Sequence, residues 1–361
     1  MKQISFLIKP ASSLCNLNCS YCFYKDIAQL RDTYSYGIMN ETTIQNIIQQ
    51  ALNQQVEQIN FCFQGGEPTL AGIQYYQTFI HYVNLYNTQK KRITYAIQTN
   101  GTILNNEWIT LFKTYDFLVG ISLDGFLKNH DSVRKDQEQN GTFQKIIASI
   151  KTLEEENIKY NILTVLTNTL AKHPVKLYNF YKRNHFEYIQ LIPCLPSLDT
   201  TTHDNTYALT PQDFASFYKT FFDLWYQDYL NNKKMSIILF DNVISMFKGE
   251  LPYQCGMLGS CQLQFVIEAN GDVYPCDFYV LDEYLCGNIN QNTLQDIMNS
   301  KQSKKFLNQP KTYCALCANC MFKPMCNGNC KRQNICMFNE HYCGYQEFLT
   351  HAYQYMMIRP I

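Results

Sequence analysis

The sixteen cysteines constrain this chain more strongly than any other feature of its sequence. Eleven of them lie between Cys255 and Cys343, and three more fall close together at Cys15, Cys19 and Cys22. A disulfide scaffold is usually a short secreted chain in which cysteine exceeds about 8–10% of the residues, whereas this chain has 361 residues. In a reducing compartment, clustered thiols indicate metal binding or catalysis. We therefore expect a cytoplasmic metalloprotein.

Composition excludes several other classes of protein. Lys+Arg and Asp+Glu each total 30, so the chain lacks the basic surplus that a nucleic-acid binder needs to neutralise phosphates. Hydrophobic residues make up 46% of the chain, which is ample for a folded core. No apolar run approaches the ~20 residues that cross a bilayer, and the first ten residues do not resemble a signal peptide. We expect no nucleic-acid partner and no membrane partner.

The first 230 residues or so alternate between β-rich runs and amphipathic stretches. Strands are predicted at Ile4–Lys9, Gln58–Gln64, Ile93–Gln98, Phe117–Leu123, Tyr160–Thr167 and Glu187–Pro193. Helices are predicted at Thr42–Val56, Ile73–Thr88, Asn105–Lys113, Thr142–Asn157, Val175–Asn184 and Pro211–Leu230. Such alternation predicts a parallel sheet with right-handed crossovers. Six units are too few for a full eight-stranded barrel, and periodicity alone leaves both a partial barrel and a doubly wound sheet open.

The pattern changes after about residue 250. Asn270-Gly271 predicts the turn of a β-hairpin between Phe265 and Cys276. The segment from Cys314 to Cys343 has little aliphatic core, so we expect bound metal to hold it together. An aromatic helix at Tyr345–Met357 follows. These changes predict an α/β domain over residues 1–235, a cysteine-rich domain over 236–345 and a terminal helix over 346–361.

Cys15, Cys19 and Cys22 form a CxxxCxxC motif directly after the first predicted strand. A structural zinc site is closed by four ligands, and no fourth Cys or His lies nearby in the sequence. Three thiolates on a 4Fe–4S cluster would leave one iron open to a substrate. Loops after parallel strands lie at the sheet edge where ligands bind. The spacing favours iron chemistry, with zinc as the alternative.

This motif, together with Tyr21, resembles the signature of radical S-adenosylmethionine (SAM) enzymes. A second family feature follows the second strand, where Gln64-Gly65-Gly66-Glu67-Pro68 is similar to the GGEP turn that holds the SAM amino group. The resemblance implies a partial (β/α)6 TIM-like barrel. It also implies that SAM is bound by Tyr21, Gly66, Ser122, Arg134 and Leu195, with Arg134 as a bidentate clamp on the carboxylate.

The cysteine-rich region resembles the SPASM extension of radical SAM enzymes that modify peptides. The resemblance implies two auxiliary 4Fe–4S clusters, and therefore three clusters in all. One would be held by Cys255, Cys261, Cys276 and Cys330, and the other by Cys317, Cys320, Cys326 and Cys343. Two zinc sites would need the same number of thiols. Cys314 and Cys336 remain rivals of Cys343 for the last ligand.

Several stretches, among them Leu7-Ile8-Lys9-Pro10 and Tyr274-Pro275-Cys276-Asp277, resemble the anaerobic sulfatase-maturating enzymes. That resemblance implies oxidation of a Ser or Cys side chain of a sulfatase to Cα-formylglycine. A 5′-deoxyadenosyl radical would remove a β-hydrogen, Asp277 would act as the base, and an auxiliary cluster would accept an electron. Tyr24 and Gln64 would line the substrate pocket.

Alternation along a strand also predicts that Cys276 and Asp277 point to opposite faces, so that Asp277 could reach a substrate while Cys276 binds metal. An Asp that only caps a hairpin end is the alternative. Two other functions stay open: a SPASM maturase that crosslinks peptides, and a non-catalytic zinc or electron-transfer module. The sequence does not choose between Ser and Cys substrates. A low-potential electron donor such as flavodoxin or ferredoxin is the expected partner besides the sulfatase.

Overall fold

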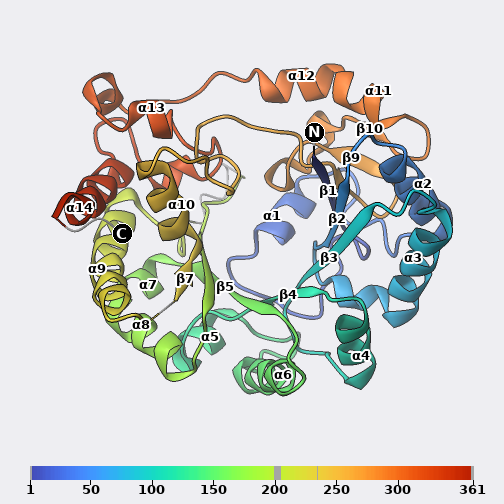
Figure 1. Ribbon diagram of the computed structural model, residues 1–361, viewed down its shortest axis with the longest axis horizontal. Helices are drawn as coiled ribbons and strands as arrows, with labels where there is room; N and C mark the ends of the chain where they lie inside the picture. The colour runs from blue at the N-terminus through green and yellow to red at the C-terminus, as the bar shows by residue number, and fades with distance from the viewer. Residues whose placement is uncertain (1, 199–204, 234, 359–361) are drawn as a thin grey trace. The chain divides into compact units, whose positions relative to one another are not determined.

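The computed structural model of the chain describes residues 2–198, 205–233 and 235–358 (Figure 1). Contacts between Cα atoms divide it into two compact units. The first comprises Met1–Ser122, Val133–Tyr160 and Gln262–Gln309, and the second comprises Leu123–Ser132, Asn161–Cys261 and Pro310–Ile361. Within the described residues, no helix combines the length and the apolar character that crossing a bilayer requires. The three-domain division by residue number stays a prediction.

The first unit is built on a sheet whose strand order is β10-β9-β8-β1-β2-β3-β4. The strands from β8 to β4 in this order pair in parallel, whereas β9 pairs antiparallel with both β8 and β10. Their bounds are β1 Gln3–Ile8, β2 Gln58–Phe63, β3 Arg92–Thr99, β4 Leu118–Ser122, β8 Val266–Ile267, β9 Asp272–Tyr274 and β10 Gly287–Asn288. The β8–β9 turn contains Gly271 at φ 92°, a conformation that glycine adopts without strain.

The helices of the first unit are α1 Phe23–Gln29, α2 Glu41–Leu52, α3 Ile73–Tyr86, α4 Asn106–Thr114, α6 Phe143–Glu155, α11 Leu294–Asn299 and α12 Lys301–Leu307. Figure 1 shows α2, α3 and α4 outside β1–β4. Asn40 caps α2 by accepting a hydrogen bond from the Thr43 backbone N–H. Phe61 and Phe63 of β2 pack edge-on against Phe79 of α3, with ring centroids 5.0 and 5.1 Å apart.

The opposite face of the same strands is polar. In β1 and β2 every second residue is buried, so that Ile4, Phe6 and Ile8 face the helices. Because strand side chains alternate, Lys9 and Gln64 at the strand ends belong to the other face. The ends of β1 and β2 therefore present polar side chains on the face opposite the helices, and we expect the functional site there.

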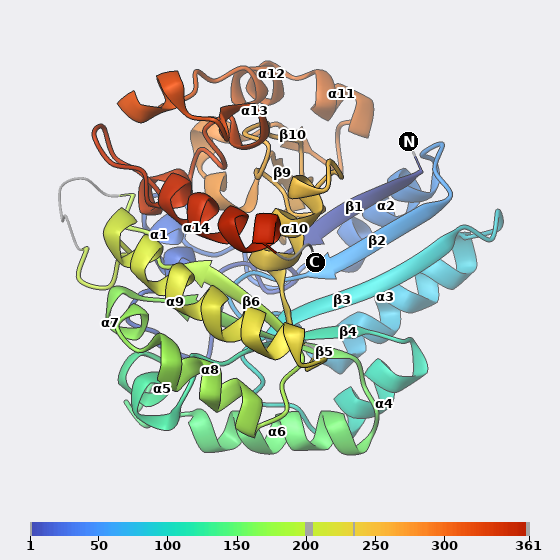
Figure 2. The ribbon, with the colours of Figure 1, turned by 60° about the vertical axis from the view of Figure 1, so that its left-hand side comes forward.

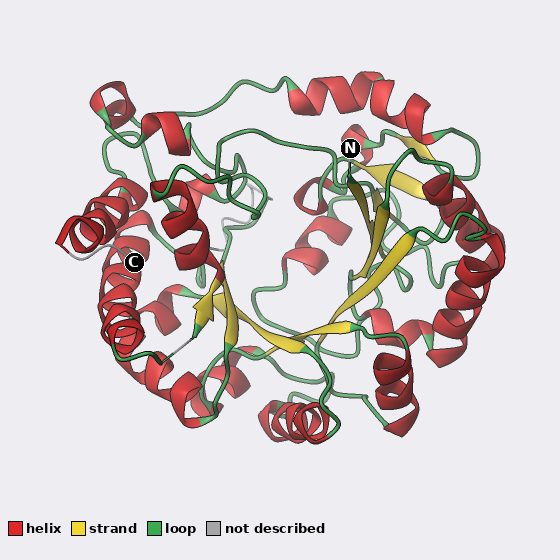
Figure 3. Cartoon of the chain, viewed as in Figure 1, coloured by secondary structure: helices red, strands yellow, loops and turns green. Residues whose placement is uncertain are grey.

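The second unit contains strands β5 Tyr160–Leu166, β6 Tyr188–Pro193 and β7 Ser236–Ile237, which pair in parallel. Its helices are α5 Leu127–Val133, α7 Asn168–Ala171, α8 Pro174–Arg183, α9 Pro211–Leu230, α10 Ile238–Phe247, α13 Lys323–Cys326 and α14 Gly344–Ile358. Helices α9 and α14 lie side by side (Figure 2), and their interface includes Phe214 and Phe222 of α9 against Phe348 of α14. The segment before α14 consists of loops and short helical turns (Figure 3).

The six strands expected before residue 235 are present, and so are the six expected helices, with shifted ends. The hairpin at Asn270-Gly271 and the last helix are also confirmed. Helices α1, α5, α7, α10, α11, α12 and α13 were not expected. Helix α1 begins directly after Cys22 and has only two buried residues, Ile27 and Ala28, so it has little of the amphipathic period on which the prediction relied.

Candidate active site

Asp277 lies at the polar face of the first unit and is bound by both predicted substrate-pocket residues. The Tyr24 hydroxyl donates a hydrogen bond of 2.6 Å to Asp277 Oδ2, and Gln64 Nε2 donates to the same oxygen at 3.0 Å. Gln64 Nε2 also contacts the Tyr24 hydroxyl. The three residues come from α1, the end of β2 and the turn Asp277–Tyr279 after β9. The structure therefore brings together side chains that are far apart in the sequence.

A buried cation lies on the other side of the same carboxylate. Lys9 Nζ is 3.2 Å from Asp277 Oδ1 and 3.8 Å from Glu268 Oε1. Arg31 Nη1 contacts the same Glu268 oxygen at 2.7 Å. The side chains of Lys9 and Glu268 are only 3% and 1% exposed, and that of Asp277 is 10% exposed. Sequence reasoning did not single out Lys9, Glu268 or Arg31. A charged residue directly after a buried strand was the available signal.

The Tyr24 phenol is a proton donor in this site. Burial, and after it the negative charge of Asp277, raises the pKa of Tyr24 well above its ordinary value. The hydroxyl therefore stays protonated at neutral pH and can donate to the carboxylate. Asp277 is not an ordinary hairpin cap, because its side chain accepts from two other side chains rather than from turn amides.

The strand argument for Asp277 was wrong in its detail. Strand β9 ends at Tyr274, and Asp277 begins a 3-10 turn that follows it. Cys276 keeps an extended backbone at φ −159° and ψ 146°, and the Asp277 backbone N–H is held by Gln264 Oε1 at 3.2 Å. Local turn geometry, rather than strand alternation, directs the Asp277 side chain.

The cysteine triplet occupies the loop between β1 and α1 in the same unit. Cys15, Cys19 and Cys22 are all partly exposed, and Cys22 is the N-cap of α1. Burial, the largest cause, raises the pKa of Cys15 to about 12, and the nearby charges of Cys19 and Cys22 add to the rise. A bound cationic metal reverses this preference and deprotonates a thiol. Three thiols in one loop are a donor set that fits an iron–sulfur cluster.

The Gly65-Gly66 turn packs directly on this cysteine loop. A Cβ atom on Gly66 would lie 2.2 Å from the Leu14 backbone oxygen. Gly65 has φ 124°, where a side chain is strained. Both glycines are therefore required for the close approach of two backbone segments next to Cys15.

The Glu67 carboxylate holds this turn in place by accepting several hydrogen bonds. Its Oε1 accepts from the Thr69 backbone at 3.0 Å and from the Thr99 hydroxyl at 2.7 Å, while Oε2 accepts from the Asn100 backbone at 2.7 Å. Burial, the largest cause, still raises the pKa of Glu67. Glu67 thus joins the ends of β2 and β3 and fixes the backbone of the glycine turn.

The residues predicted to bind SAM are distributed over both units. In the first, the Arg134 guanidinium lies 5.5 Å from the centre of the Tyr21 ring, and Gln98 Nε2 donates to the Ser122 hydroxyl at 3.1 Å. Tyr21 and Arg134 are thus brought together. Leu195 follows β6 in the second unit, where it is partly exposed. Their contacts with SAM remain predictions.

Cys255, Cys261 and Cys330 belong to the second unit, and Cys276 belongs to the first. A Cβ atom on Gly256 would lie 2.7 Å from Cys330 Cβ, so the Cys255 segment passes directly against Cys330. The charge of Cys330 contributes to the raised pKa of Cys261, whose largest cause is burial. Three of the four thiols predicted for one auxiliary cluster are therefore neighbours.

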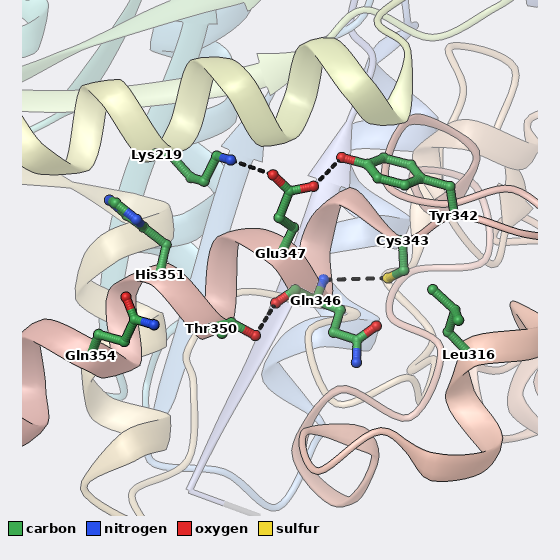
Figure 4. Close-up of a pocket in the computed structure, with 9 residues that line it drawn as sticks. All are labelled: Lys219, Leu316, Tyr342, Cys343, Gln346, Glu347, Thr350, His351 and Gln354. Atoms are coloured by element: carbon green, nitrogen blue, oxygen red, sulfur yellow. Dashed lines mark hydrogen bonds and ion pairs between the residues drawn. The ribbon is translucent and has the colours of Figure 1, made fainter.

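The cysteines predicted to bind the other auxiliary cluster include Cys343, which directly precedes α14. Burial raises the pKa of Cys343 to about 12, and the charges of Cys326, Cys314 and Cys317 are close enough to contribute. Cys336 is elsewhere: it is fully buried, and its thiol contacts the Cys194 carbonyl at 3.4 Å. Figure 4 shows the Cys343 thiol, which accepts a hydrogen bond of 3.3 Å from the Gln346 backbone N–H, and Glu347, which Lys219 and Tyr342 contact.

Within the described ranges, no three Cys, His, Asp or Glu side chains converge closely enough to hold a single metal ion.

Comparison with known proteins decides the family. Residues 10–180 match the radical SAM superfamily, and residues 255–321 match the SPASM iron–sulfur cluster-binding domain. A cysteine-type anaerobic sulfatase-maturating enzyme of Clostridium novyi is 44% identical over 92% of this chain and 89% of its own length. The chain belongs to the anaerobic sulfatase-maturating enzymes. These enzymes use SAM and 4Fe–4S clusters, and the thiols described above fit those cofactors.

Further relatives and solved structures agree. A cysteine-type enzyme of Clostridium perfringens is 36% identical, covering 98% of this chain and 97% of its own. A serine-type enzyme of Bacteroides thetaiotaomicron is 29% identical over 98% of this chain and 91% of its own. The solved structure of native anSMEcpe with bound AdoMet and a Kp18Cys peptide has a TM-score of 0.90 at 34% identity, covering 99% of this chain and 98% of that one. This similarity confirms the partial barrel with a C-terminal SPASM domain and excludes the doubly wound sheet.

Proposed function

We propose that this chain oxidises a Ser or Cys side chain of a sulfatase to Cα-formylglycine. Family membership supports the reaction class. The observation that carries the proposal is the buried Asp277 carboxylate, which is bound by Tyr24 and Gln64 on one oxygen and faces Lys9 with the other. A carboxylate fixed in this way can accept the proton that the oxidation releases.

The oxidation removes a hydrogen atom, a proton and an electron from the substrate side chain. When bound, SAM and the clusters supply the radical that takes the β-hydrogen atom and the acceptor that takes the electron. Asp277 accepts the proton from the hydroxyl or thiol, which becomes more acidic once the neighbouring carbon has lost its hydrogen atom. Tyr24 and Gln64 orient the carboxylate for this transfer. A Ser side chain then becomes the aldehyde directly, and a Cys side chain becomes a thioaldehyde that water hydrolyses.

We infer that a Cys-containing sulfatase segment is the better substrate. The relatives of 44% and 36% identity are described as cysteine-type, whereas the serine-type relative of Bacteroides thetaiotaomicron is 29% identical. A pair of peptides that differ only in Ser or Cys at the target position tests this directly. Faster aldehyde formation from the Cys peptide supports the inference, and faster formation from the Ser peptide contradicts it.

We propose three 4Fe–4S clusters with Cys343, rather than Cys336, as the last ligand. The contact of Cys336 with the Cys194 carbonyl and the grouping of Cys343 with Cys326 and Cys317 support this choice. Cys314 lies in the same group as Cys343 and stays a rival. Cys343→Ala should lose about a third of the bound iron, while Cys336→Ala should keep it. Equal iron content in both variants contradicts the assignment.

We also propose that Tyr21, Gly66, Ser122, Arg134 and Leu195 contact SAM. The proximity of Arg134 to the Tyr21 ring supports part of this set. Arg134→Gln should raise the SAM concentration needed for half-maximal cleavage by about tenfold or more, because a charged hydrogen bond is worth about 1.5–3 kcal/mol. An unchanged SAM requirement would remove Arg134 from the set.

A low-potential protein such as flavodoxin or ferredoxin is our proposed electron donor, and the reducing cytoplasm is the proposed location. Iron–sulfur potentials extend to about −700 mV, and the most negative ones need a strong donor. Reduced flavodoxin should replace a chemical reductant in the SAM cleavage assay. Failure of both flavodoxin and ferredoxin in that assay contradicts this partner.

Anaerobic incubation of the reconstituted protein with SAM, reductant and a sulfatase-motif peptide tests the function itself. Mass spectrometry should detect loss of two hydrogens at Ser, or replacement of the Cys thiol by an aldehyde oxygen. A crosslinked peptide would indicate the alternative maturase chemistry. Intact SAM under strong reduction would contradict radical SAM activity altogether.

A further inference from the structure

Lys9 is the buried charge that the proposed reaction leaves without a role. It follows β1 directly, and its backbone N–H donates to the Ile267 carbonyl at 2.8 Å. Since Ile8 pairs with Ile267 in the parallel β1–β8 ladder, the next residues, Lys9 and Glu268, are neighbours. The sheet register itself therefore places a cation and an anion together at the polar face.

The Lys9 ammonium lies between two buried carboxylates. It is 3.2 Å from Asp277 Oδ1 and 3.8 Å from Glu268 Oε1. It also lies 4.8 Å from the centre of the Tyr24 ring, so it contacts two of the three residues proposed to act on the substrate. An ammonium with a stem of four methylenes seldom lies 3% exposed without a specific partner.

A second buried cation, Arg31, also contacts Glu268. Arg31 Nη1 contacts Glu268 Oε1 at 2.7 Å, and Arg31 Nη2 donates to the Tyr34 carbonyl at 2.8 Å. The charges therefore alternate from Arg31 through Glu268 and Lys9 to Asp277. Without Lys9, two buried carboxylates would face each other with no cation between them, and like charges repel strongly at low dielectric.

The two oxygens of Asp277 have separate partners. Oδ2 accepts from Tyr24 and Gln64, whereas Oδ1 faces Lys9 without a well-directed hydrogen bond. The ammonium is thus a second contact that, together with the hydrogen bonds to Oδ2, limits rotation of the carboxylate. A base displaced by about 1 Å can lose about 10²-fold in rate.

We propose that Lys9 is a positioning residue that holds Asp277 in place for proton removal, so that its loss uncouples SAM cleavage from aldehyde formation. This inference rests on the proposed function. In Lys9→Met the radical forms at the normal rate, but the substrate is oxidised slowly because the carboxylate has turned away. More SAM is then consumed for each aldehyde formed.

The experiment compares 5′-deoxyadenosine with formylglycine peptide, using the full-length protein with its clusters reconstituted and its iron content matched. Lys9→Met should cleave SAM within about twofold of wild type while aldehyde formation falls by about tenfold or more. The peptide KM should change little, and the loss should appear in kcat. Lys9→Arg should recover part of the aldehyde yield. The exposed Lys151→Met on α6 serves as the control.

A charge-matched double variant separates positioning from folding. Lys9→Met/Glu268→Gln removes one cation and one anion, so the net charge of the buried group is unchanged. Its thermal unfolding temperature should return toward wild type relative to Lys9→Met, because the buried group no longer carries an excess negative charge. Its aldehyde yield should stay low, because Asp277 still lacks the ammonium.

Three results would overturn the inference. One is an unchanged ratio of aldehyde to 5′-deoxyadenosine in Lys9→Met, and another is parallel loss of both products. The third is recovery of the aldehyde yield together with stability in the double variant, which would make Lys9 purely structural. If wild type itself forms no aldehyde, the proposed function fails instead, and the two failures are therefore distinguishable.

Discussion

Two carboxylates in this chain have partners of the same kind but different surroundings. Asp277 in the first unit is bound by a lysine and a tyrosine, and so is Glu347 in the second unit (Figure 4). The Asp277 side chain is 10% exposed, whereas that of Glu347 is 41% exposed. A lysine and a tyrosine therefore bind a largely buried carboxylate at Asp277 and a partly exposed carboxylate at Glu347.

Burial changes what these contacts do. A solvated ion pair is worth about 0–1 kcal/mol, since water screens the charges and the side chains lose freedom. A buried charge that loses its partner costs about 3–5 kcal/mol. The Asp277 group consequently needs each of its members, while the Glu347 group can lose one with little effect. A site that must hold a base in one orientation benefits from the first arrangement.

The largest expected difference is in the free energy of unfolding, between a variant of the buried Arg31 and a variant of Lys219. Arg31→Met leaves the buried Glu268 with Lys9 alone, so the free energy of unfolding should fall by about 3–5 kcal/mol. Lys219→Met, at the Glu347 group, should lower it by about 1 kcal/mol at most. Urea unfolding of anaerobically purified protein measures both. Equal losses would remove the distinction between the two groups.

Tyr24→Phe should weaken catalysis more than stability. It removes the donor to Asp277 Oδ2 and keeps the aromatic ring beside Lys9. A hydrogen bond to a charged group is worth about 1.5–3 kcal/mol, so aldehyde formation should fall by about tenfold or more while SAM cleavage continues. Tyr342→Phe, the matched change at Glu347, should leave the aldehyde yield unaltered. A comparable loss in both variants would mean that the tyrosines share a structural role.

Glu347 should show a small and pH-dependent contribution to stability. Hydrogen bonds from Lys219, the largest cause, and from Tyr342 lower the pKa of Glu347. Its stabilisation is therefore complete above the unfolded value of about 4.3 and disappears as the pH falls through the lower folded value. Glu347→Gln should cost about 0.5 kcal/mol at pH 7, and the cost should shrink below about pH 4. Unfolding curves at several pH values measure this cost. A cost of Glu347→Gln that grows as the pH falls would contradict the prediction.

The smallest expected effect comes from salt. Raising the ionic strength to about 1 M shortens the screening length to about 3 Å. The cost of Glu347→Gln at pH 7 should then largely vanish, whereas that of Arg31→Met should persist because the contact of Arg31 with Glu268 is buried. Salt sensitivity of the Arg31 variant would show that water reaches the buried group.

Local patterns in the sequence predicted the scaffold well. Runs rich in β-preferring residues identified β1 and β2, and Asn270-Gly271 identified the hairpin that leads to Asp277. Cysteine spacing predicted the loops that we propose bind the clusters. The role proposed for Asp277 came from resemblance, because a single aspartate after a strand has no distinctive local pattern.

The parts that could not be predicted depend on contacts between distant segments. Lys9 and Glu268 become neighbours only through the pairing of β1 with β8, and Arg31 reaches Glu268 from a loop after α1. Cys336 and Cys343 have similar spacing to the upstream cysteines, yet one is buried against Cys194 and the other lies among thiols. The spacing of cysteines along the chain does not show which of them lie close together in the folded protein.

The central claim is that Asp277 removes the substrate proton after the radical has formed. Asp277→Asn keeps the shape of the side chain and one acceptor oxygen for Tyr24 and Gln64, but it removes the basicity of the carboxylate. With a Cys-containing sulfatase peptide, SAM and reductant under anaerobic conditions, we predict 5′-deoxyadenosine at nearly the wild-type rate and aldehyde reduced by about 10²-fold or more. Formation of aldehyde by Asp277→Asn at the wild-type ratio to 5′-deoxyadenosine would contradict the account.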